Sequence, residues 1–166
     1  MEKDKKKRIL YLRTDLGTKN LIGGGSVAHT LGVIKGLLEL DYFVICASSA
    51  MHAILAKEAI DVTFLHLPNM CKLLGFKITA LISNLIFYYK TKKLIKKKQI
   101  DLIYQRYSML NIVGIALAHV YNIPLYLEFN GSEVWVDKNW TKSSKLPLTW
   151  LIEKIEMLNV TYADKV

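Results

Sequence analysis

The sequence predicts an α/β fold built on a doubly wound parallel sheet. Short apolar segments alternate with longer segments whose apolar residues recur every three or four positions, the spacing of a helix that buries one face. Strands that are apolar along their whole length are typical of a parallel sheet covered on both faces. Right-handed crossovers then place helices on both sides of the sheet, as in Rossmann-like domains.

The N-terminal part alternates strand and helix patterns after a basic start. An apolar segment predicts a strand at 8–13, and the spacing of Val27, Leu31 and Ile34 predicts a helix at 26–40. Ser26 is expected to cap this helix, because its hydroxyl can accept a hydrogen bond from a first-turn amide. The elements expected next are a strand at 42–47, a helix at 50–59, a strand at 62–67 and a long helix at 73–98.

The C-terminal part continues the alternation. The expected elements are a strand at 102–105, a helix at 108–121, a strand at 124–129 and a helix at 146–161. The last helix has an apolar face that includes Leu151, Ile152 and Ile155. Residues 163–166 have the pattern of the entry to a sixth strand, a place where domains rarely end. We therefore interpret 1–166 as one N-terminal domain of a longer protein.

Positive charge is concentrated in two blocks. The net charge is +9, from 23 Lys and Arg against 14 Asp and Glu. Residues 3–8 and 90–98 contain nearly half of the bases, and outside them basic and acidic residues balance. A nucleic-acid-binding protein typically spreads its basic residues over one face and contains a recognisable motif. Neither is found, so no nucleic-acid partner is expected.

The second basic block follows an apolar segment, 73–89, in which Lys77 is the one charged residue. Three interpretations stay open. The segment forms a core helix with a solvated lysine end, or it crosses a membrane at the short limit of length. Alternatively, it rests on an anionic membrane, with Phe76, Ile86, Phe87, Tyr88 and Tyr89 inserted. The residues that would then contact lipid headgroups are Lys90, Lys92, Lys93, Lys96, Lys97 and Lys98.

Composition and cysteine spacing limit the class of protein further. A hydrophobic content of 52% with 22% charged residues excludes a disordered chain. Cys46 and Cys71 lie in apolar segments without CxxC spacing, which argues against a disulfide scaffold or a zinc site. Arg13, Asp15 and Lys19 interrupt any signal-peptide pattern. We therefore expect a cytoplasmic protein without a bound metal, peripheral on the inner face of the membrane if the membrane interpretation holds.

A glycine-rich segment precedes the first expected helix. Residues 23–28 match the pattern G-x-G-x-x-A, but nine residues separate them from the strand, whereas a dinucleotide fingerprint follows its strand directly. No carboxylate follows the second strand and no Gly-Lys-Ser/Thr follows the glycines, so neither a dehydrogenase nor a P-loop is indicated. The segment is either a flexible connector or a place where an anion such as a diphosphate meets helix-start amides at Gly24 and Gly25.

The expected topology selects where a ligand binds. In a doubly wound sheet, ligands bind at the carboxyl ends of the strands. This rule selects the segments 14–29, 105–108 and 128–135. Glu128 and Asn130 lie two residues apart at the end of a strand and therefore share a face.

Four motifs occur in a characteristic order. They are Gly24-Gly25-Ser26-Val27-Ala28-His29, Asp101-Leu102-Ile103-Tyr104-Gln105-Arg106, Ile123-Pro124-Leu125-Tyr126-Leu127-Glu128-Phe129-Asn130-Gly131 and Ala163-Asp164-Lys165-Val166. Together they resemble the N-terminal domain of retaining GT-B glycosyltransferases of the group 1, family 4 kind, over about 8–166. Asn130 stands where many members have His, so any role of that His does not transfer.

The resemblance implies a function. Such enzymes move a sugar from a nucleotide-diphosphate donor to an acceptor hydroxyl with retention of the anomeric configuration, usually without a bound metal, and no cofactor is expected. The N-terminal domain shapes the acceptor side, and the donor-binding C-terminal domain is absent from this chain, so the chain alone is expected to be inactive. Synthesis of cell-surface polysaccharide or glycolipid is the expected context, with a sugar or lipid-linked acceptor.

The resemblance also implies roles for individual residues. Gly24, Gly25 and Ser26 would present backbone amides to the donor diphosphate. His29 would lie on the first helical turn, where a structural role is an equal alternative. Arg106 would contact phosphate or sugar hydroxyls, unless it forms a salt bridge to Glu128 or Glu133.

Glu128 and Asn130 are the candidate catalytic residues. Glu128 would hold an acceptor hydroxyl or take part in proton transfer, and Asn130 would form a hydrogen bond with the sugar. A second function class stays open beside the transferase: a non-catalytic Rossmann-like module that binds a nucleotide or a membrane surface.

Overall fold

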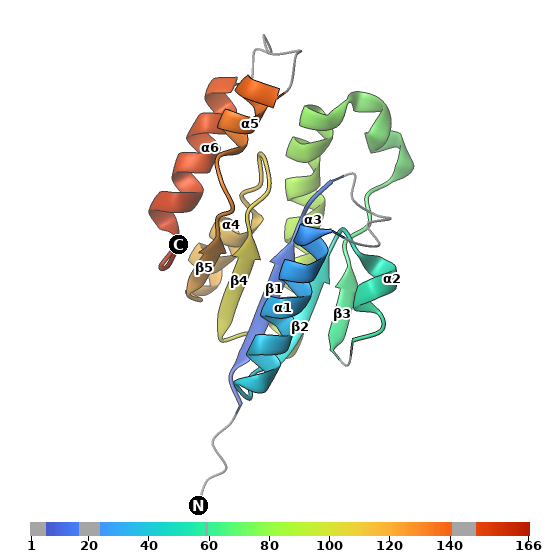
Figure 1. The fold of residues 1–166 in the computed structure, drawn as a ribbon, viewed down its shortest axis with the longest axis vertical. Helices are drawn as coiled ribbons and strands as arrows, with labels where there is room; N and C mark the ends of the chain where they lie inside the picture. The colour runs from blue at the N-terminus through green and yellow to red at the C-terminus, as the bar shows by residue number, and fades with distance from the viewer. Residues whose placement is uncertain (1–5, 17–23, 59, 141–148) are drawn as a thin grey trace, which may run out of the picture.

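The computed structural model describes residues 6–16, 24–58, 60–140 and 149–166. Five parallel strands form one sheet in the order β3-β2-β1-β4-β5 (Figure 1). Their bounds are β1 Arg8–Arg13, β2 Phe43–Ser48, β3 Asp61–Phe64, β4 Leu102–Arg106 and β5 Leu125–Glu128. The chain runs outward from β1 to β3 and then crosses to β4 on the other side of β1. This is the doubly wound parallel sheet that the alternating pattern predicts.

Helices cover both faces of the sheet. The helical elements are α1 Gly25–Glu39, α2 His52–Leu55, the 3₁₀ helix η1 Asn69–Leu74, α3 Phe76–Lys98, α4 Val113–Tyr121, α5 Glu133–Trp140 and α6 Thr149–Tyr162. Side chains alternate between the faces along each strand. Tyr11 packs with α1 residues on one face, whereas Leu10 and Leu12 pack with α3 and α4 residues on the other.

Strand register aligns the ends that later form the site. Arg13 at the end of β1 lies opposite Ser48 of β2 and Arg106 of β4, and Arg106 lies opposite Glu128 of β5. Because the strands are parallel, all four residues lie at the carboxyl edge of the sheet. At the other side of β5, Lys165 forms a parallel bridge with Tyr126, so the last residues run beside β5 as the sixth-strand pattern predicts.

Several helix boundaries differ from those expected. The helix expected at 108–121 begins at Val113, whose amide donates to Asn111 Oδ1 at 3.1 Å. The helix expected at 50–59 is reduced to α2, His52–Leu55. Residue 59 lies outside the described residues. The cap expected of Ser26 is wrong: the N-cap is Gly24, and the Ser26 hydroxyl accepts a hydrogen bond from Arg13 instead.

Helix α5 is not expected from the sequence, because its residues lack a clear apolar spacing. Its first turn is completed by acceptors outside the helix. Glu156 Oε2 of α6 accepts hydrogen bonds from the amides of Glu133 and Val134, at 2.9 and 3.5 Å. Ser132 Oγ accepts a third from the amide of Trp135 at 3.1 Å. A carboxylate beside helix-start amides stabilises the helix, and in this protein it is supplied by tertiary structure.

The long helix α3 has one buried and one exposed face. Phe87 is fully buried in the core, so the interpretation in which it inserts into a membrane is wrong for this residue. Across the parts of the chain that the structure describes, no helix combines the length and apolar character needed to cross a bilayer. Three of the lysines at its end are used within the protein: Lys90 donates to the His66 carbonyl, Lys92 lies over the Tyr88 ring, and Lys98 pairs with Asp61. Lys93, Lys96 and Lys97 are exposed.

Candidate substrate-binding site

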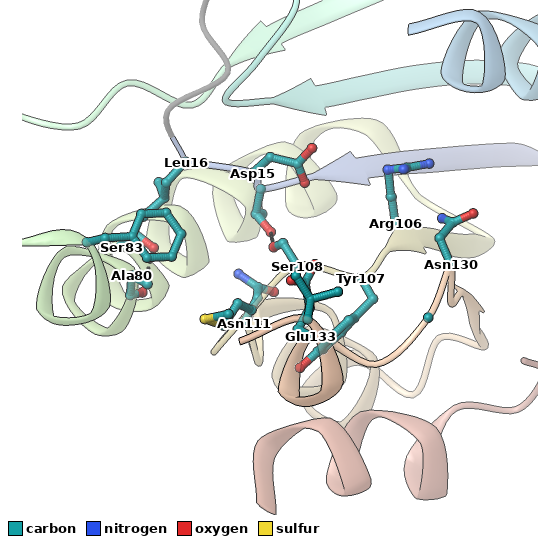
Figure 2. Close-up of a pocket in the computed structure, with 15 residues that line it drawn as sticks. Asp15, Leu16, Ala80, Ser83, Arg106, Tyr107, Ser108, Asn111, Asn130 and Glu133 are labelled. Carbon is teal, nitrogen blue, oxygen red and sulfur yellow. Dashed lines mark hydrogen bonds between the residues drawn. The ribbon is translucent and has the colours of Figure 1, made fainter. Parts of the chain in front are cut away.

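A cavity of about 310 Å³ lies where β1, β4 and β5 end (Figure 2). All three segments selected from the sequence contribute lining residues, and α3 and α5 complete the wall. The polar lining includes Thr14, Asp15, Arg106, Ser108, Asn130 and Glu133, and the apolar lining includes Leu16, Phe76 and Val136. Hydroxyl, amide and charged groups beside apolar surface suit a ligand with both polar and apolar faces, such as a sugar.

Glu128 is the common partner of three residues that the sequence selects. Its Oε1 atom is in an ion pair with Arg106, accepts a hydrogen bond from Asn130 Nδ2 at 2.6 Å and lies 3.1 Å from His29 Nε2. Its Oε2 atom accepts a hydrogen bond from the Tyr11 hydroxyl at 3.5 Å. The Glu128 side chain is only 7% exposed. Its oxygens are therefore bound within the protein, and it is not among the residues that line the cavity.

Arg106 combines the two roles between which the sequence could not decide. It forms a salt bridge with Glu128, not with Glu133, and it also lines the cavity. Figure 2 shows Arg106 and Asn130 next to each other at one end of the cavity, and both contact the same oxygen of Glu128. The carboxylate thus orients a guanidinium and an amide that remain available to a ligand.

The glycine turn, residues 24–26, begins α1 beside this group but outside the cavity lining. Gly24 has a φ of 105°, a value that favours glycine, and its carbonyl accepts hydrogen bonds from the amides of Val27 and Ala28. Both Gly24 and Gly25 are exposed. Their position at a helix start leaves first-turn amides without acceptors inside the helix.

Arg13 fixes the glycine turn to the sheet, and sequence reasoning did not select it. Its side chain is only 1% exposed. Nη2 donates to Ser26 Oγ at 2.7 Å, Nη1 donates to Thr30 Oγ1 at 2.7 Å, and Nε donates to Asp15 Oδ2 at 2.8 Å. Arg13 therefore connects the first turn of α1 to a carboxylate in the cavity wall. The available signal was an arginine at the end of an apolar strand with an acid two residues later.

Tyr11 supports the same group from the sheet. Burial raises the pKa of its hydroxyl well above the ordinary value, and the nearby Glu128 carboxylate raises it further. The hydroxyl therefore stays protonated and can donate to Glu128. Its ring stacks on Tyr104, with 5.5 Å between ring centroids.

Glu133 lines the cavity with a carboxylate that no described residue binds. Its backbone amide is bound to Glu156, but its carboxylate has no hydrogen bond or ion pair with any described residue. Burial raises the pKa of this carboxyl, and the charges of Asp15 and Glu156 raise it further, while Arg106 lowers it. The sequence suggested Glu133 only as a partner of Arg106, a contact that is not formed.

Comparisons with known proteins show which folds this chain resembles. No protein-family model matches the sequence, and no curated protein matches it. Sucrose-phosphate synthase from Thermosynechococcus elongatus is similar in structure, with a TM-score of 0.68 and 15% identity over 96% of this chain and 41% of that chain. The calicheamicin glycosyltransferase CalG4 has a TM-score of 0.60 and 14% identity, over 96% of this chain and 42% of that chain. The C-terminal domain of the PF1911 hydrogenase from Pyrococcus furiosus has a TM-score of 0.54 and 13% identity, over 75% of this chain and 93% of that chain.

The chain therefore has the fold of a GT-B glycosyltransferase domain. It spans about two fifths of the length of the two glycosyltransferases. At these identities the similarity establishes the fold, and the hydrogenase domain illustrates that one sheet topology serves several functions. The polar cavity at the strand ends is the region of this fold to which a function can be assigned.

Proposed function

We propose that this chain is the acceptor-side domain of a retaining glycosyltransferase that moves a sugar from a nucleotide-diphosphate donor to an acceptor hydroxyl in cell-surface polysaccharide or glycolipid synthesis. One observation supports this most directly: the glycine turn and the polar cavity are joined through Arg13 and through the contact of His29 with Glu128. A donor phosphate at the turn would then lie close to an acceptor in the cavity.

The chemistry asks for stabilisation of negative charge on the departing diphosphate. Backbone amides at the start of a helix provide it, since they are oriented before the reaction begins. In this proposal the amides of Gly25 and Ser26 face the diphosphate, and a second domain binds the rest of the nucleotide. His29 lies on the same turn of α1, next to Glu128.

On the acceptor side, Arg106 and Asn130 bind the sugar directly. Glu128 acts as a positioning residue, because its oxygens already accept from Arg106, Asn130 and Tyr11. A role of Glu128 as a general base is thereby disfavoured, since a base must be within reach of the hydroxyl that it deprotonates. Asn130 remains the proposed catalytic contact.

The test uses the full-length protein with its donor domain. With a panel of nucleotide sugars, we expect one donor to be consumed in the presence of a glycoside acceptor, and NMR of the product to show the anomeric configuration of the donor. Gly24→Val forces a branched side chain into a conformation that favours glycine, and we expect a loss of about 100-fold in rate, as for removal of an oxyanion donor. Asn130→Ala should also lower the rate of sugar transfer.

The control is Glu39→Gln, on the exposed end of α1 and away from the cavity, which should leave the rate unchanged. No donor consumed by the wild type, or full activity in both site variants, contradicts the proposal. An inverted product contradicts retention alone.

We also propose that α3 rests on an anionic membrane surface, with a different set of residues from the one expected. The outer stripe of α3, defined as Ile78, Ile82, Leu85 and Tyr89, follows helical spacing on the exposed side and continues into Lys93 and Lys96. Leu73 of η1, which precedes it, is 85% exposed. An apolar stripe that ends in exposed lysines is complementary to acyl chains and anionic headgroups.

A further inference from the structure

Among the cavity-lining residues that the structure describes, one charge is unpaired, and it is negative. The charged side chains of this lining are Asp15, Arg106 and Glu133. Asp15 Oδ2 lies 2.6 Å from Arg13 Nη2, and Arg106 is paired with Glu128. The charges of Asp15 and Arg106 are therefore balanced within the protein, whereas the Glu133 carboxylate has no partner among the described residues.

The position of Glu133 is fixed by the fold. It is the first residue of α5, and its amide donates to Glu156 Oε2 at 2.9 Å. The next residue, Val134, is buried in a cluster with α6 residues. Figure 2 labels Glu133 among the residues that line the cavity, as it does Ser108 and Tyr107. Tyr107 is only 6% exposed, and its hydroxyl has no hydrogen-bond partner within the described residues.

The charges around Glu133 make this part of the cavity unfavourable for a second anion. Burial raises the pKa of the Glu133 carboxyl most. Asp15 from the segment after β1 and Glu156 from α6 raise this pKa further, and Arg106 from β4 lowers it. A carboxylate or phosphate placed beside Glu133 would meet the same repulsion, with less water to screen it than at the surface. A hydroxyl or an ammonium group would instead form a favourable hydrogen bond.

We propose that Glu133 determines acceptor specificity: it accepts a hydrogen bond from a hydroxyl or amino group of the acceptor sugar and excludes acceptors that are anionic at that position. The inference rests on the proposed function and adds the substrate class, a neutral or amino sugar. Ser108 and Asn130 line the same cavity and supply hydrogen bonds to further hydroxyls. Phe76 and Val136 provide apolar surface for the C–H face of the ring.

The experiment compares three matched acceptors in the full-length protein: a neutral hexoside, its 2-amino analogue and its uronic acid, each at the same aglycone. For the wild type we expect kcat/KM on the neutral or amino acceptor to exceed that on the uronic acid at least tenfold. Glu133→Gln removes the charge with little change of shape, and it should lower this ratio at least tenfold. Glu133→Asp should restore part of the ratio, and Glu39→Gln should leave it unchanged.

The variant is expected to fold. Because the native pKa of Glu133 lies above its ordinary value of 4.5, the stability associated with this group is fully present below pH 4.5 and is lost as the pH rises through the native pKa. Glutamine does not ionise, so Glu133→Gln should melt no lower than the wild type at pH 7. If it does melt lower, the ratio of kcat/KM values measured for Glu133→Asp, which keeps the charge, shows whether the charge determines specificity.

The outcomes separate this inference from the proposed function. Transfer with an unchanged ratio in Glu133→Gln, or a wild-type preference for the uronic acid, overturns the specificity role and leaves the transferase standing. Donor hydrolysis without transfer to the neutral or amino acceptor also overturns it. Failure to consume any nucleotide sugar, with or without acceptor, is evidence against the transferase itself.

Discussion

At the scale of single residues, the site depends on buried ion pairs that orient groups at its surface. Arg13 and Glu128 are both almost inaccessible to water. Arg13 contacts α1 and the segment after β1, and Glu128 contacts residues of β1, α1 and β4. Burying a charge is unfavourable unless it is paired and hydrogen-bonded, which both side chains are. Their shared effect is to hold the first turn of α1 at a fixed distance from the ends of β4 and β5.

Loss of Arg13 should therefore damage both stability and the site. Arg13→Met keeps the apolar stem but leaves Asp15 without its counter-charge, and we expect it to lower the free energy of unfolding by about 3 kcal/mol, the lower end for breaking a buried pair because Asp15 is partly exposed. Denaturant unfolding measures this loss.

Arg13→Lys is the matched variant. It restores the charge but not the planar fork that reaches Ser26, Thr30 and Asp15 together. We expect recovery of part of the stability while the KM for the nucleotide sugar stays raised, since the glycine turn is no longer fixed. Equal stability of all three proteins would show that the buried pair contributes nothing.

At the scale of elements, glycines in helices have opposite roles that the sequence does not distinguish. Gly32 in α1 has open space around the position of a Cβ atom. In α4, a Cβ on Gly114 would lie 1.6 Å from Gln105 Oε1. Gln105 is fully buried, and its Nε2 atom is near the Asn111 and Asn159 side chains at 3.4 and 3.5 Å, so it has little freedom to move.

The pair of alanine substitutions should consequently change stability in opposite directions. Gly32→Ala should raise the free energy of unfolding by about 0.5–1 kcal/mol, because alanine has the higher helix propensity. Gly114→Ala should lower it by about 1–3 kcal/mol through overpacking. Thermal and denaturant unfolding measure both, and Gln105→Ala in the Gly114→Ala background should recover part of the loss. Similar effects at the two sites would contradict the close packing of α4 on Gln105.

Element boundaries also show why secondary structure is only partly predictable. The strand positions follow from the sequence within a few residues, because an apolar segment between polar ones is a local signal. The position of helix α5 does not follow from the sequence, since its first amides donate to Glu156, a residue of α6. The expected start of α4 lies too early, because Asn111 ends the preceding loop by accepting from Val113. Glu156 cannot be assigned from a local pattern, because it lies far along the chain from Glu133.

At the scale of the whole molecule, the second basic block, 90–98, and an exposed apolar stripe meet along α3. The outer stripe leads into Lys93 and Lys96, and Lys97, the next residue, is also exposed. The other lysines of the block, Lys90, Lys92 and Lys98, contact groups within the protein. Electrostatic attraction to a membrane is screened by salt, whereas insertion of apolar side chains is not. The two contributions can therefore be measured separately.

Binding to liposomes should depend both on the electrostatic attraction and on the insertion of apolar side chains. We expect the protein to sediment with anionic vesicles of phosphatidylglycerol and phosphatidylcholine, less so at high salt, and hardly with phosphatidylcholine alone. Replacing Lys93, Lys96 and Lys97 by alanine should weaken binding at low salt, and Leu85→Ser should weaken it at every salt concentration.

The control replaces Lys35, Lys57 and Lys154, which are exposed lysines outside α3, by alanine. It removes the same charge and should have a much smaller effect. Equal binding to neutral and anionic vesicles, no binding to either, or an equal effect of the two triple variants contradicts a membrane role for α3.

The order of residues alone was enough to establish the parallel α/β architecture and the three segments that meet at the end of the sheet. Apolar periodicity is a local property, and the connections between parallel strands have few topological solutions. Which side chains remain available there became clear only from the folded arrangement. Glu128, chosen from the sequence, has its oxygens occupied by Arg106, Asn130 and Tyr11, whereas Glu133 and Arg13 acquire their roles from neighbours far along the chain. The function of a polar group depends on which partners already satisfy it, and those partners are fixed by packing.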